Sequence, residues 1–482
     1  MLGTRLRSIL EEIDQRILLH EEQIALLRAM RHSTARELDA IVYPVLILPS
    51  EIPSEIFIHY VESHPTRNSM RLTWVCQSWR TVAISTCQLW TQCMDLYTTS
   101  ALQIWLSRAG DLPLNLDFQA TLGISSEGHD IAYHTISRFS SQLKTLTLST
   151  LAGSITIPPR PFPRLEKLSI DSENSGDEDD DDDETSAPRL DAPRLREVVL
   201  NNAAVKQLQA TLPKRQLTKL DLTADLGDCL AFLRHTPNLQ ELAIDSSDFD
   251  HGALVPVTLP RLRSIHIGLL TSPEMLRYLT LPVLDRLSIS VYVGSDETSA
   301  SVNYMLERSG CTLRQLDLSL HHTDSEWLDD FLDFVSLPSL RELTLRAPDG
   351  TYGALNNLLR NVAQNRTLPA LESLVIHECQ FHVDLTKFVD MLAARTKNAP
   401  GVARLKSFQL SFGVDPVQGG RRDYVEIEPS NKADRDVKDS LEKLHKLRAQ
   451  GLQVDIRSDF KTLNSGKIDS GIIEGIRADH EF

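Results

Sequence analysis

Residues 217–222 read LTKLDL, residues 239–244 read LQELAI and residues 313–318 read LRQLDL. Their shared pattern, L-x-x-L-x-[LI] with apolar substitutions, begins at eleven positions: Leu143, Leu165, Leu195, Leu217, Leu239, Leu262, Leu284, Leu313, Leu340, Leu371 and Leu405. Successive starts lie 22 to 34 residues apart, and seven of them have a proline two positions earlier. Because side chains alternate along a strand, each pattern predicts a short strand with one buried face, and the proline ends the segment before it.

One such unit cannot bury its apolar face, whereas a stack of units builds a continuous core. The pattern resembles the leucine-rich repeat, in which each unit supplies one strand and a returning helix or loop. This resemblance implies an α/β solenoid over residues 99–416. The Asn or Cys that the family places eight positions after the first leucine occurs only as Cys379. We therefore expect an irregular solenoid, and a purely structural scaffold is the alternative reading of the repeat.

Both ends of the repeat region carry helix-and-strand patterns. Residues 102–117 read LQIWLSRAGDLPLNLD, which predicts a helix ended by Gly110 and then an alternating strand. Beyond Pro416 the repeat fades, and residues 417–482 are expected to hold a cap and a flexible tail. Within them, residues 432–450 predict a charged helix that stops at Gly451, followed by a final strand over 452–457 that caps the solenoid.

A second decisive stretch lies nearer the start of the chain. Residues 46–57 read LILPSEIPSEIF, residues 71–83 read RLTWVCQSWRTVA, and Leu89-Trp90 follow. Ser50 is a good N-cap, after which Ile52, Ile56 and Tyr60 share one helical face. A later run places Leu72, Val75, Cys76 and Trp79 at three- and four-residue spacing. So small a module cannot bury all this apolar surface alone, which predicts a partner surface on it.

This stretch resembles the F-box, a helical module that docks onto a Skp-type adaptor and through it onto a cullin. Its module spans 41–98, and together with the repeats the chain resembles the expanded fungal F-box-like families. The resemblance implies that the adaptor contacts Leu48, Pro49, Ile52, Ile56, Val75, Trp79, Leu89 and Trp90. The exposed apolar surplus is expected chiefly at Leu48, Pro49, Ile52 and Trp90. The alternative is a small helical subdomain packed against the rest of the chain.

The first forty residues predict a long helix over 5–39, stopped by Tyr43-Pro44. Its apolar residues follow a heptad seam that only His20 interrupts: Leu6, Leu10, Ile13, Ile17, Ile24 and Leu27. About three heptads make a marginal coiled coil in isolation. The helix therefore either forms a homodimer or packs on the F-box-like module, and the sequence leaves both open.

Composition narrows the function classes. The net charge of −16 argues against binding nucleic acid through its phosphates, and no apolar run approaches the ~20 residues of a membrane span. Eight consecutive carboxylates, Asp177 to Glu184, predict a disordered insertion near 172–187, which is either solvated without a partner or an acidic segment that binds basic proteins. The charged first helix predicts no cleaved signal peptide. Six cysteines without a C-x-x-C pair suit a reducing compartment, the cytoplasm or nucleus.

Nothing in the sequence predicts a catalytic site, a cofactor or a metal, since no H-E-x-x-H, G-x-S-x-G or P-loop motif occurs. We therefore expect a non-catalytic substrate receptor of an SCF-type E3 ubiquitin ligase. The alternative is an interaction scaffold outside a cullin complex. The target is expected on the half-exposed strand positions, where Asp171, Asp221, Asp245 and Asp317 favour a polar, basic protein segment.

Overall fold

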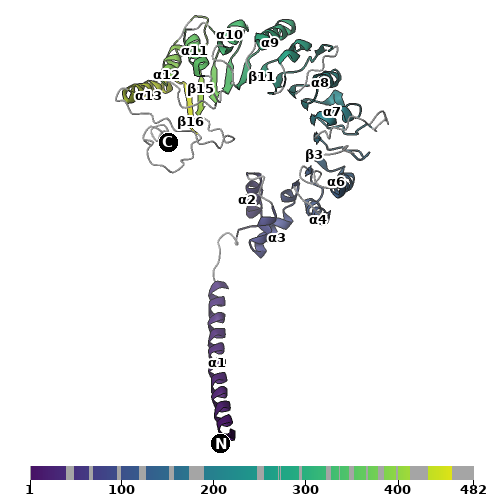
Figure 1. Cartoon of the computed structure of the whole chain (residues 1–482), viewed down its shortest axis with the longest axis vertical. Helices are drawn as coiled ribbons and strands as arrows, with labels where there is room; N and C mark the ends of the chain where they lie inside the picture. Colours follow the sequence, from purple (N-terminus) through teal and green to yellow (C-terminus); the bar gives the residue numbers. More distant parts are fainter. Residues whose placement is uncertain are drawn as a thin grey trace. The chain divides into compact units, whose positions relative to one another are not determined.

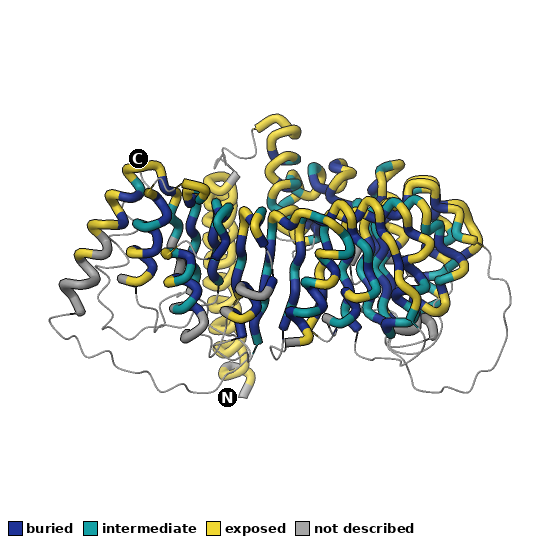
Figure 2. The backbone as a smooth tube through the Cα atoms, turned by 90° about the horizontal axis from the view of Figure 1, so that it is seen from above, coloured by how far each residue is buried: buried dark blue, intermediate teal, exposed yellow. Residues whose placement is uncertain are grey.

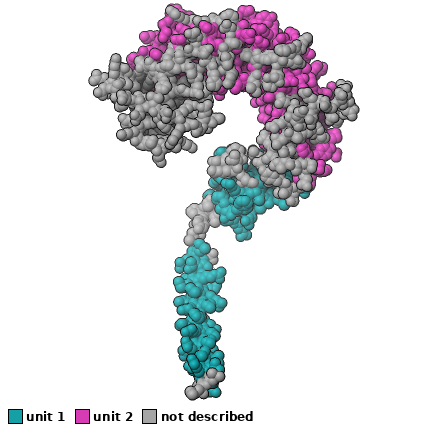
Figure 3. Space-filling view, in the orientation of Figure 1, with its two compact units in different colours: residues 1–93, 100–112 teal, residues 94–99, 113–482 magenta. Residues whose placement is uncertain are grey.

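The computed structural model divides into two compact units (Figure 3): residues 1–93 with 100–112, and residues 94–99 with 113–482. We call them unit 1 and unit 2. The structure describes residues 2–39, 48–63, 69–94, 99–118, 126–150, 157–172, 189–246, 254–269, 271, 273–291, 296–321, 327–335, 337–346, 352–364, 367–377, 385–397, 400–412 and 433–458. Cys379, Tyr43-Pro44 and the run from Asp177 to Glu184 lie outside these ranges.

Unit 1 is helical. Its elements are α1 (Leu2–Asp39), α2 (Glu51–Glu62), η2 (Ser69–Trp74), α3 (Gln77–Ser85), η3 (Cys87–Trp90) and most of α4 (Thr99–Ala109), with the short strand β1 (Gln92–Met94) at the unit boundary. The N-terminal helix that the heptad pattern predicts is therefore present as α1. All six seam residues are exposed, by between 46% and 64%. The seam packs on no other part of the described chain.

Unit 2 contains a parallel sheet of 13 strands whose order follows the chain. The strands are β2 (Leu114–Phe118), β3 (Leu143–Thr150), β4 (Lys167–Ser172), β5 (Glu197–Asn201), β6 (Lys219–Thr223), β7 (Glu241–Asp245), β9 (Ser264–Ile267), β11 (Arg286–Val291), β12 (Gln315–Leu320), β13 (Glu342–Arg346), β14 (Ser373–His377), β15 (Ser407–Phe412) and β16 (Gln453–Ser458). Every leucine pattern coincides with one strand. Two further short strands, β8 (Val257–Thr258) and β10 (Leu279–Thr280), pair separately.

The register of this sheet aligns the leucines of neighbouring repeats. Leu220 pairs with Leu242, and Leu222 pairs with Ile244. The strands accordingly alternate between buried and half-exposed residues (Figure 2). The first leucine of each pattern is at most 4% exposed, so these side chains form one continuous core. The predicted alternation is confirmed.

The prolines before the strands lie within tight turns. In each of the seven units that has one, the N–H of the first leucine donates to the carbonyl three residues earlier, as from Leu239 to Thr236 at 3.2 Å. The proline is therefore the second residue of a four-residue turn, where its fixed φ matches the turn geometry. The seven are Pro163, Pro193, Pro237, Pro260, Pro282, Pro338 and Pro369. Each turn delivers the chain directly into its strand.

The segments that return the chain between strands differ in length and kind. They include α6 (Ser126–Phe139), α7 (Asn202–Leu208), η4 (Lys214–Gln216), α8 (Leu226–Leu233), η5 (Pro273–Tyr278), α9 (Asp296–Ser309), α10 (Trp327–Phe334), α11 (Tyr352–Ala363) and α12 (Leu385–Arg395). Helices α8 to α12 line one face of the sheet (Figure 1). The half-exposed strand residues lie on the opposite face.

The segments that flank the repeats match the sequence predictions closely. Helix α4 ends at Ala109, and Gly110 adopts a left-handed φ of 62° before β2 begins. At the other end, α13 (Ala433–Ala449) is followed by Gly451 with a φ of 92°. Strand β16 then pairs in parallel with β15 and completes the sheet. Both predicted helix stops and the capping strand are confirmed.

Candidate functional site

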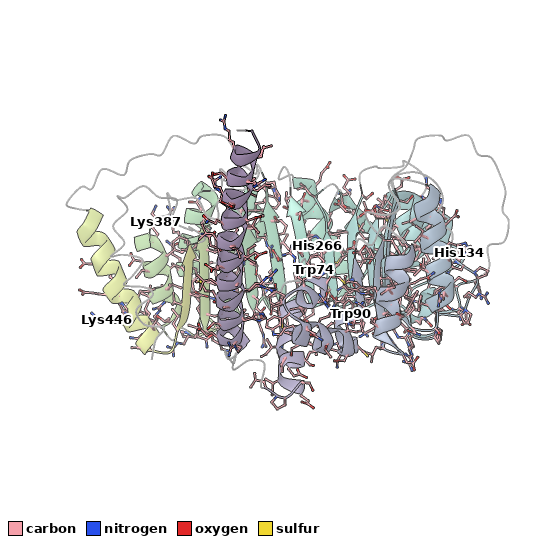
Figure 4. All side chains as sticks on the ribbon, turned by 90° about the horizontal axis from the view of Figure 1, so that it is seen from below. Trp74, Trp90, His134, His266, Lys387 and Lys446 are labelled. Carbon is pink, nitrogen blue, oxygen red and sulfur yellow. The ribbon has the colours of Figure 1, made fainter. Side chains whose placement is uncertain are left out.

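The helical module of unit 1 is built around two tryptophans, Trp90 and Trp105, the first of which is labelled in Figure 4. Trp90 is fully buried, and its indole N–H donates to the Ala83 carbonyl at 2.8 Å. The Trp105 ring meets Trp90 edge-on, with centroids 4.8 Å apart, and the Arg108 guanidinium lies 4.4 Å from the Trp90 ring centroid. These contacts satisfy the polar edge of Trp90 and cover its faces, so this side chain holds η3, α3 and α4 together.

This packing corrects part of the predicted adaptor surface. Trp90 and Leu89 were expected to contact a partner, but they are 0% and 3% exposed. The Leu89 carbonyl also accepts a 2.7 Å hydrogen bond from the buried Ser69 hydroxyl. Both residues therefore form core in this structure, because α4 supplies the apolar cover that the isolated module would lack.

Helix α2 and the residues just before it present apolar side chains that remain accessible. Leu48, Ile52 and Ile56 are 40%, 47% and 50% exposed. On an adjacent face of the helix, Pro53 and Phe57 are buried, and the Phe57 ring lies 4.8 Å from the Trp79 ring. Helix α2 therefore packs one apolar stripe against the module and leaves a second apolar stripe exposed to solvent.

The start of α2 differs in one detail from the sequence prediction. Ser50 occupies the N-cap position, but its side chain makes no capping hydrogen bond. Instead the Pro49 carbonyl accepts the Ile52 N–H at 3.0 Å, and the Ser50 carbonyl accepts the Ser54 N–H at 3.1 Å. Pro49 is exposed beside this turn. The helix start therefore depends on main-chain bonds.

The second apolar run is divided between two elements. η2 ends at Trp74, and α3 begins at Gln77 with Cys76 as its N-cap, whose Sγ accepts the Trp79 N–H at 3.5 Å. Cys76 is therefore a cap and not part of a helical core stripe. The break leaves Val75 59% exposed and Trp74 68% exposed.

Most of the predicted adaptor residues are accessible, and one candidate was missed. Leu48, Pro49, Ile52, Ile56 and Val75 are exposed, and Trp79 is half-buried against Phe57. Trp74 was not predicted, yet exposed aromatic side chains are frequent binding anchors. The signal for it was present in the sequence, since Trp74 does not fit the spacing of Leu72, Val75 and Trp79.

The four predicted target-binding aspartates share the open face of the sheet but do not form one cluster. Asp221 and Asp245 lie on the neighbouring strands β6 and β7 but are two residues out of register, since Asp221 pairs with Ala243 and Asp245 pairs with Thr223. Asp317 lies on β12, and Asp171 lies on β4. Asp317 forms an ion pair with Arg346 at 3.3 Å, and the Asn201 amide donates a hydrogen bond to the Asp171 carboxylate.

A ladder of alternating charges crosses the same face. Register places Lys167, Glu197, Lys219 and Glu241 side by side on β4 to β7. Glu197 bridges the two lysines at 2.8 and 3.7 Å, and Lys219 also lies 3.8 Å from Glu241. Although burial opposes ionisation, the nearby lysines lower the pKa of Glu197. This face is therefore mixed in charge, and its preference for a basic target stays a prediction.

Asp221 differs from Glu197 in the direction in which its pKa is shifted. Its burial raises its pKa, while His266 and Lys219 nearby oppose that change. The His266 Nδ1 lies 2.9 Å from the Ser288 hydroxyl on the next strand. Gly268 follows, and a Cβ there would lie 2.5 Å from Asp245 Cγ, so the glycine makes room for the Asp245 carboxylate.

Within the residues that the structure describes, no group of three His, Cys, Asp or Glu side chains could hold a metal ion. Burial raises the pKa of the Cys229 thiol to about 12, so this cysteine is a poor nucleophile. In the same ranges, no helix is both long and apolar enough to cross a membrane.

Comparison with known proteins adds no assignment. No protein-family model matches this sequence, and no curated protein matches it.

Proposed function

We propose that this protein is the target-recognition subunit of an SCF-type E3 ubiquitin ligase. The observation that carries the proposal is the helical module of unit 1. Its core is closed by Trp90 and Trp105, yet Leu48, Ile52 and Trp74 remain exposed. The ordered F-box-like motif of residues 46–90 covers the same module. Unit 2, with its long parallel sheet, then presents the target.

The exposed apolar residues of the module support a protein partner. Ile52 and Ile56 lie one helical turn apart on α2 and form a ridge that water solvates poorly. Trp74 adds an aromatic anchor of the kind that dominates binding free energies. A Skp-type adaptor is the partner that the motif implies, and it connects the chain to a cullin.

In this role the chain contributes no reactive group of its own. It binds the adaptor through unit 1 and the target through unit 2. A target lysine is thereby held near a ubiquitin carrier that the cullin recruits, which raises the effective concentration of the two reactants. Ubiquitin transfer belongs to the partner subunits.

The test is co-purification of the adaptor and the cullin with the full chain. The variant Leu48→Ala/Pro49→Ala removes exposed apolar surface from the module. Val255→Ala/Val283→Ala is the matched control, since both valines are exposed in unit 2. We expect adaptor and cullin to be lost from the first variant and retained by the control. Equal adaptor recovery with both variants contradicts the proposal.

A scaffold acting outside a cullin complex is the second candidate, and the exposed seam of α1 favours it. A long helix with an uncovered apolar seam is a typical assembly element. The same co-purification separates the candidates, because a scaffold recovers adaptor without cullin under conditions in which known cullin complexes survive.

A further inference from the structure

A concave surface lies at the end of the sheet where strands β5, β6 and β7 begin. It encloses about 930 Å³, a volume typical of ligand sites. One wall is the turn over residues 209–216, and the residues just before the three strands, Arg196, Thr218 and Gln240, form another part of the lining. We call this surface the edge groove.

The edge groove is strongly basic. Its lining includes Arg189, Arg196, Lys214, Arg215 and Arg261, together with His235, but no Asp or Glu. Among the described residues, no ion pair uses any of these five cations. In a chain of net charge −16, such a group of unneutralised cations is a local exception. It attracts anions to one place.

Hydrogen bonds hold the walls of the edge groove in position. The Gln216 amide donates to the Ala192 and Leu195 carbonyls at 2.6 and 3.1 Å. The Asn238 amide donates to the Arg215 carbonyl at 2.6 Å. Because these bonds fix the turns that carry the cations, a ligand would meet a preformed site and little ordering would be required on binding.

The charged form of Lys214 is destabilised by its position in the groove wall. It is half-buried, its ammonium lies 4.6 Å from the Phe232 ring centroid, and burial lowers its pKa. A bound anion would restore part of the stabilisation that Lys214 loses by leaving water.

We propose that the edge groove binds an acidic peptide segment of the target protein, whose negative groups are carboxylates or phosphates. As a target site it rests on the proposed function, whereas peptide binding itself does not. Leu190, Leu212 and Pro213 add apolar lining for the peptide's side chains. No Phe, Tyr or Trp side chain lines the edge groove, so it lacks the extended stacking platform of single-stranded nucleic acid sites.

The test measures binding of fluorescent peptides to the full chain by anisotropy. The probes are a glutamate-rich peptide, the same peptide with phosphoserines, a neutral peptide of equal length and a single-stranded oligothymidylate. The binding variant is Arg189→Gln/Arg215→Gln/Arg261→Gln, in which all three side chains are exposed. Arg160→Gln/Arg341→Gln/Arg360→Gln makes the same charge change at exposed sites outside the edge groove.

We expect both acidic peptides to bind the wild-type chain and the neutral peptide to bind more weakly. The binding variant should lose about tenfold in affinity, and the control should keep its affinity apart from a small long-range effect. The stronger acidic peptide identifies the source of the charge. Equal losses in both variants, or tighter binding of the oligothymidylate than of either peptide, overturn the proposal.

Two further measurements make the outcome specific. Retained adaptor co-purification by the binding variant shows that unit 1 is intact, so failure of peptide binding is distinguishable from failure of the proposed function. Replacing Asp177 to Glu184 by Asn and Gln removes eight carboxylates that end five residues before Arg189 in the sequence, and we expect such carboxylates to compete with an acidic peptide. Peptide affinity should rise in that chain, and a fall would contradict anion recognition.

Discussion

Trp90 and Trp74 lie in the same helical module but have opposite environments. Trp90 is enclosed by Trp105 and Arg108, whereas Trp74 faces solvent. Trp90→Ala should destabilise the module by about 3–5 kcal/mol, because it leaves a large cavity. Trp74→Ala should change stability by less than about 0.5 kcal/mol yet weaken adaptor binding. Chemical denaturation and an adaptor titration measure the two effects, and a large stability loss in Trp74→Ala contradicts its assignment.

Asp221 supplies a pH-dependent prediction. Its folded pKa is raised above the usual 3.8, mainly by burial. Below pH 3.8 the carboxyl is protonated in both states, and as the pH rises the unfolded state ionises first. Asp221 therefore costs stability at neutral pH. Asp221→Asn should raise the midpoint of urea unfolding at neutral pH, and the gain should vanish below pH 3.8.

Asp317→Asn is the contrasting variant, since it removes the partner of Arg346. It should give no such gain at neutral pH. If both variants shift the unfolding midpoint in the same direction, local burial does not explain the behaviour of Asp221.

Residue patterns could predict which leucines are buried, because the strand period of two leaves little freedom. They could not predict the environment of Trp90 or Trp74. A core residue and a binding anchor are both large and apolar, and only the position of α4 decides which one is covered. The mixed charge of the strand face could not be predicted from the sequence pattern either. Arg346 and Asn201 reach Asp317 and Asp171 from neighbouring strands, which are distant in sequence.

At the scale of elements, α1 carries the clearest prediction. Its seam is exposed, and we expect it to mediate self-association. In a parallel pair, Arg16 of one helix would approach Glu21 of the other. We expect the full chain to sediment as a dimer and Ile17→Asp/Ile24→Asp to sediment as a monomer.

Leu19→Asp/Leu26→Asp is the matched control for α1, because these exposed leucines lie off the heptad seam. It should remain dimeric. A wild-type chain that stays monomeric across the accessible concentration range contradicts the prediction, and monomers in both variants show that overall apolarity, not the seam, drives association.

Element boundaries were predictable where local chemistry determines them. Gly110 and Gly451 end their helices with left-handed φ angles that other residues adopt at a cost. The prolines were expected to end the preceding segment and to lead into a strand, and the structure shows that they do so as the second residue of a four-residue turn. The break between η2 and α3 was not predictable from apolar spacing. It depends on Cys76 capping α3 through a sulfur atom, a weak acceptor that sequence patterns do not single out.

At the scale of the whole molecule, the different surfaces of the two units support the proposal that the chain is a target receptor. Unit 1 exposes apolar residues, and unit 2 combines a mixed-charge sheet face with the basic edge groove. The repeated leucines were sufficient to predict the strands and their buried faces, and the parallel pairing of those strands is what the structure adds. The edge groove was not predictable, because its five cations come from turns of successive repeats and form no motif in the sequence.

The most direct test of the receptor proposal is a calorimetric titration of the full chain with a purified Skp-type adaptor. We expect saturable one-to-one binding per chain. The Leu48→Ala/Pro49→Ala variant should abolish the heat, and Val255→Ala/Val283→Ala should preserve it. Absence of binding by the folded wild-type chain, or equal binding by both variants, would contradict adaptor recognition by the helical module.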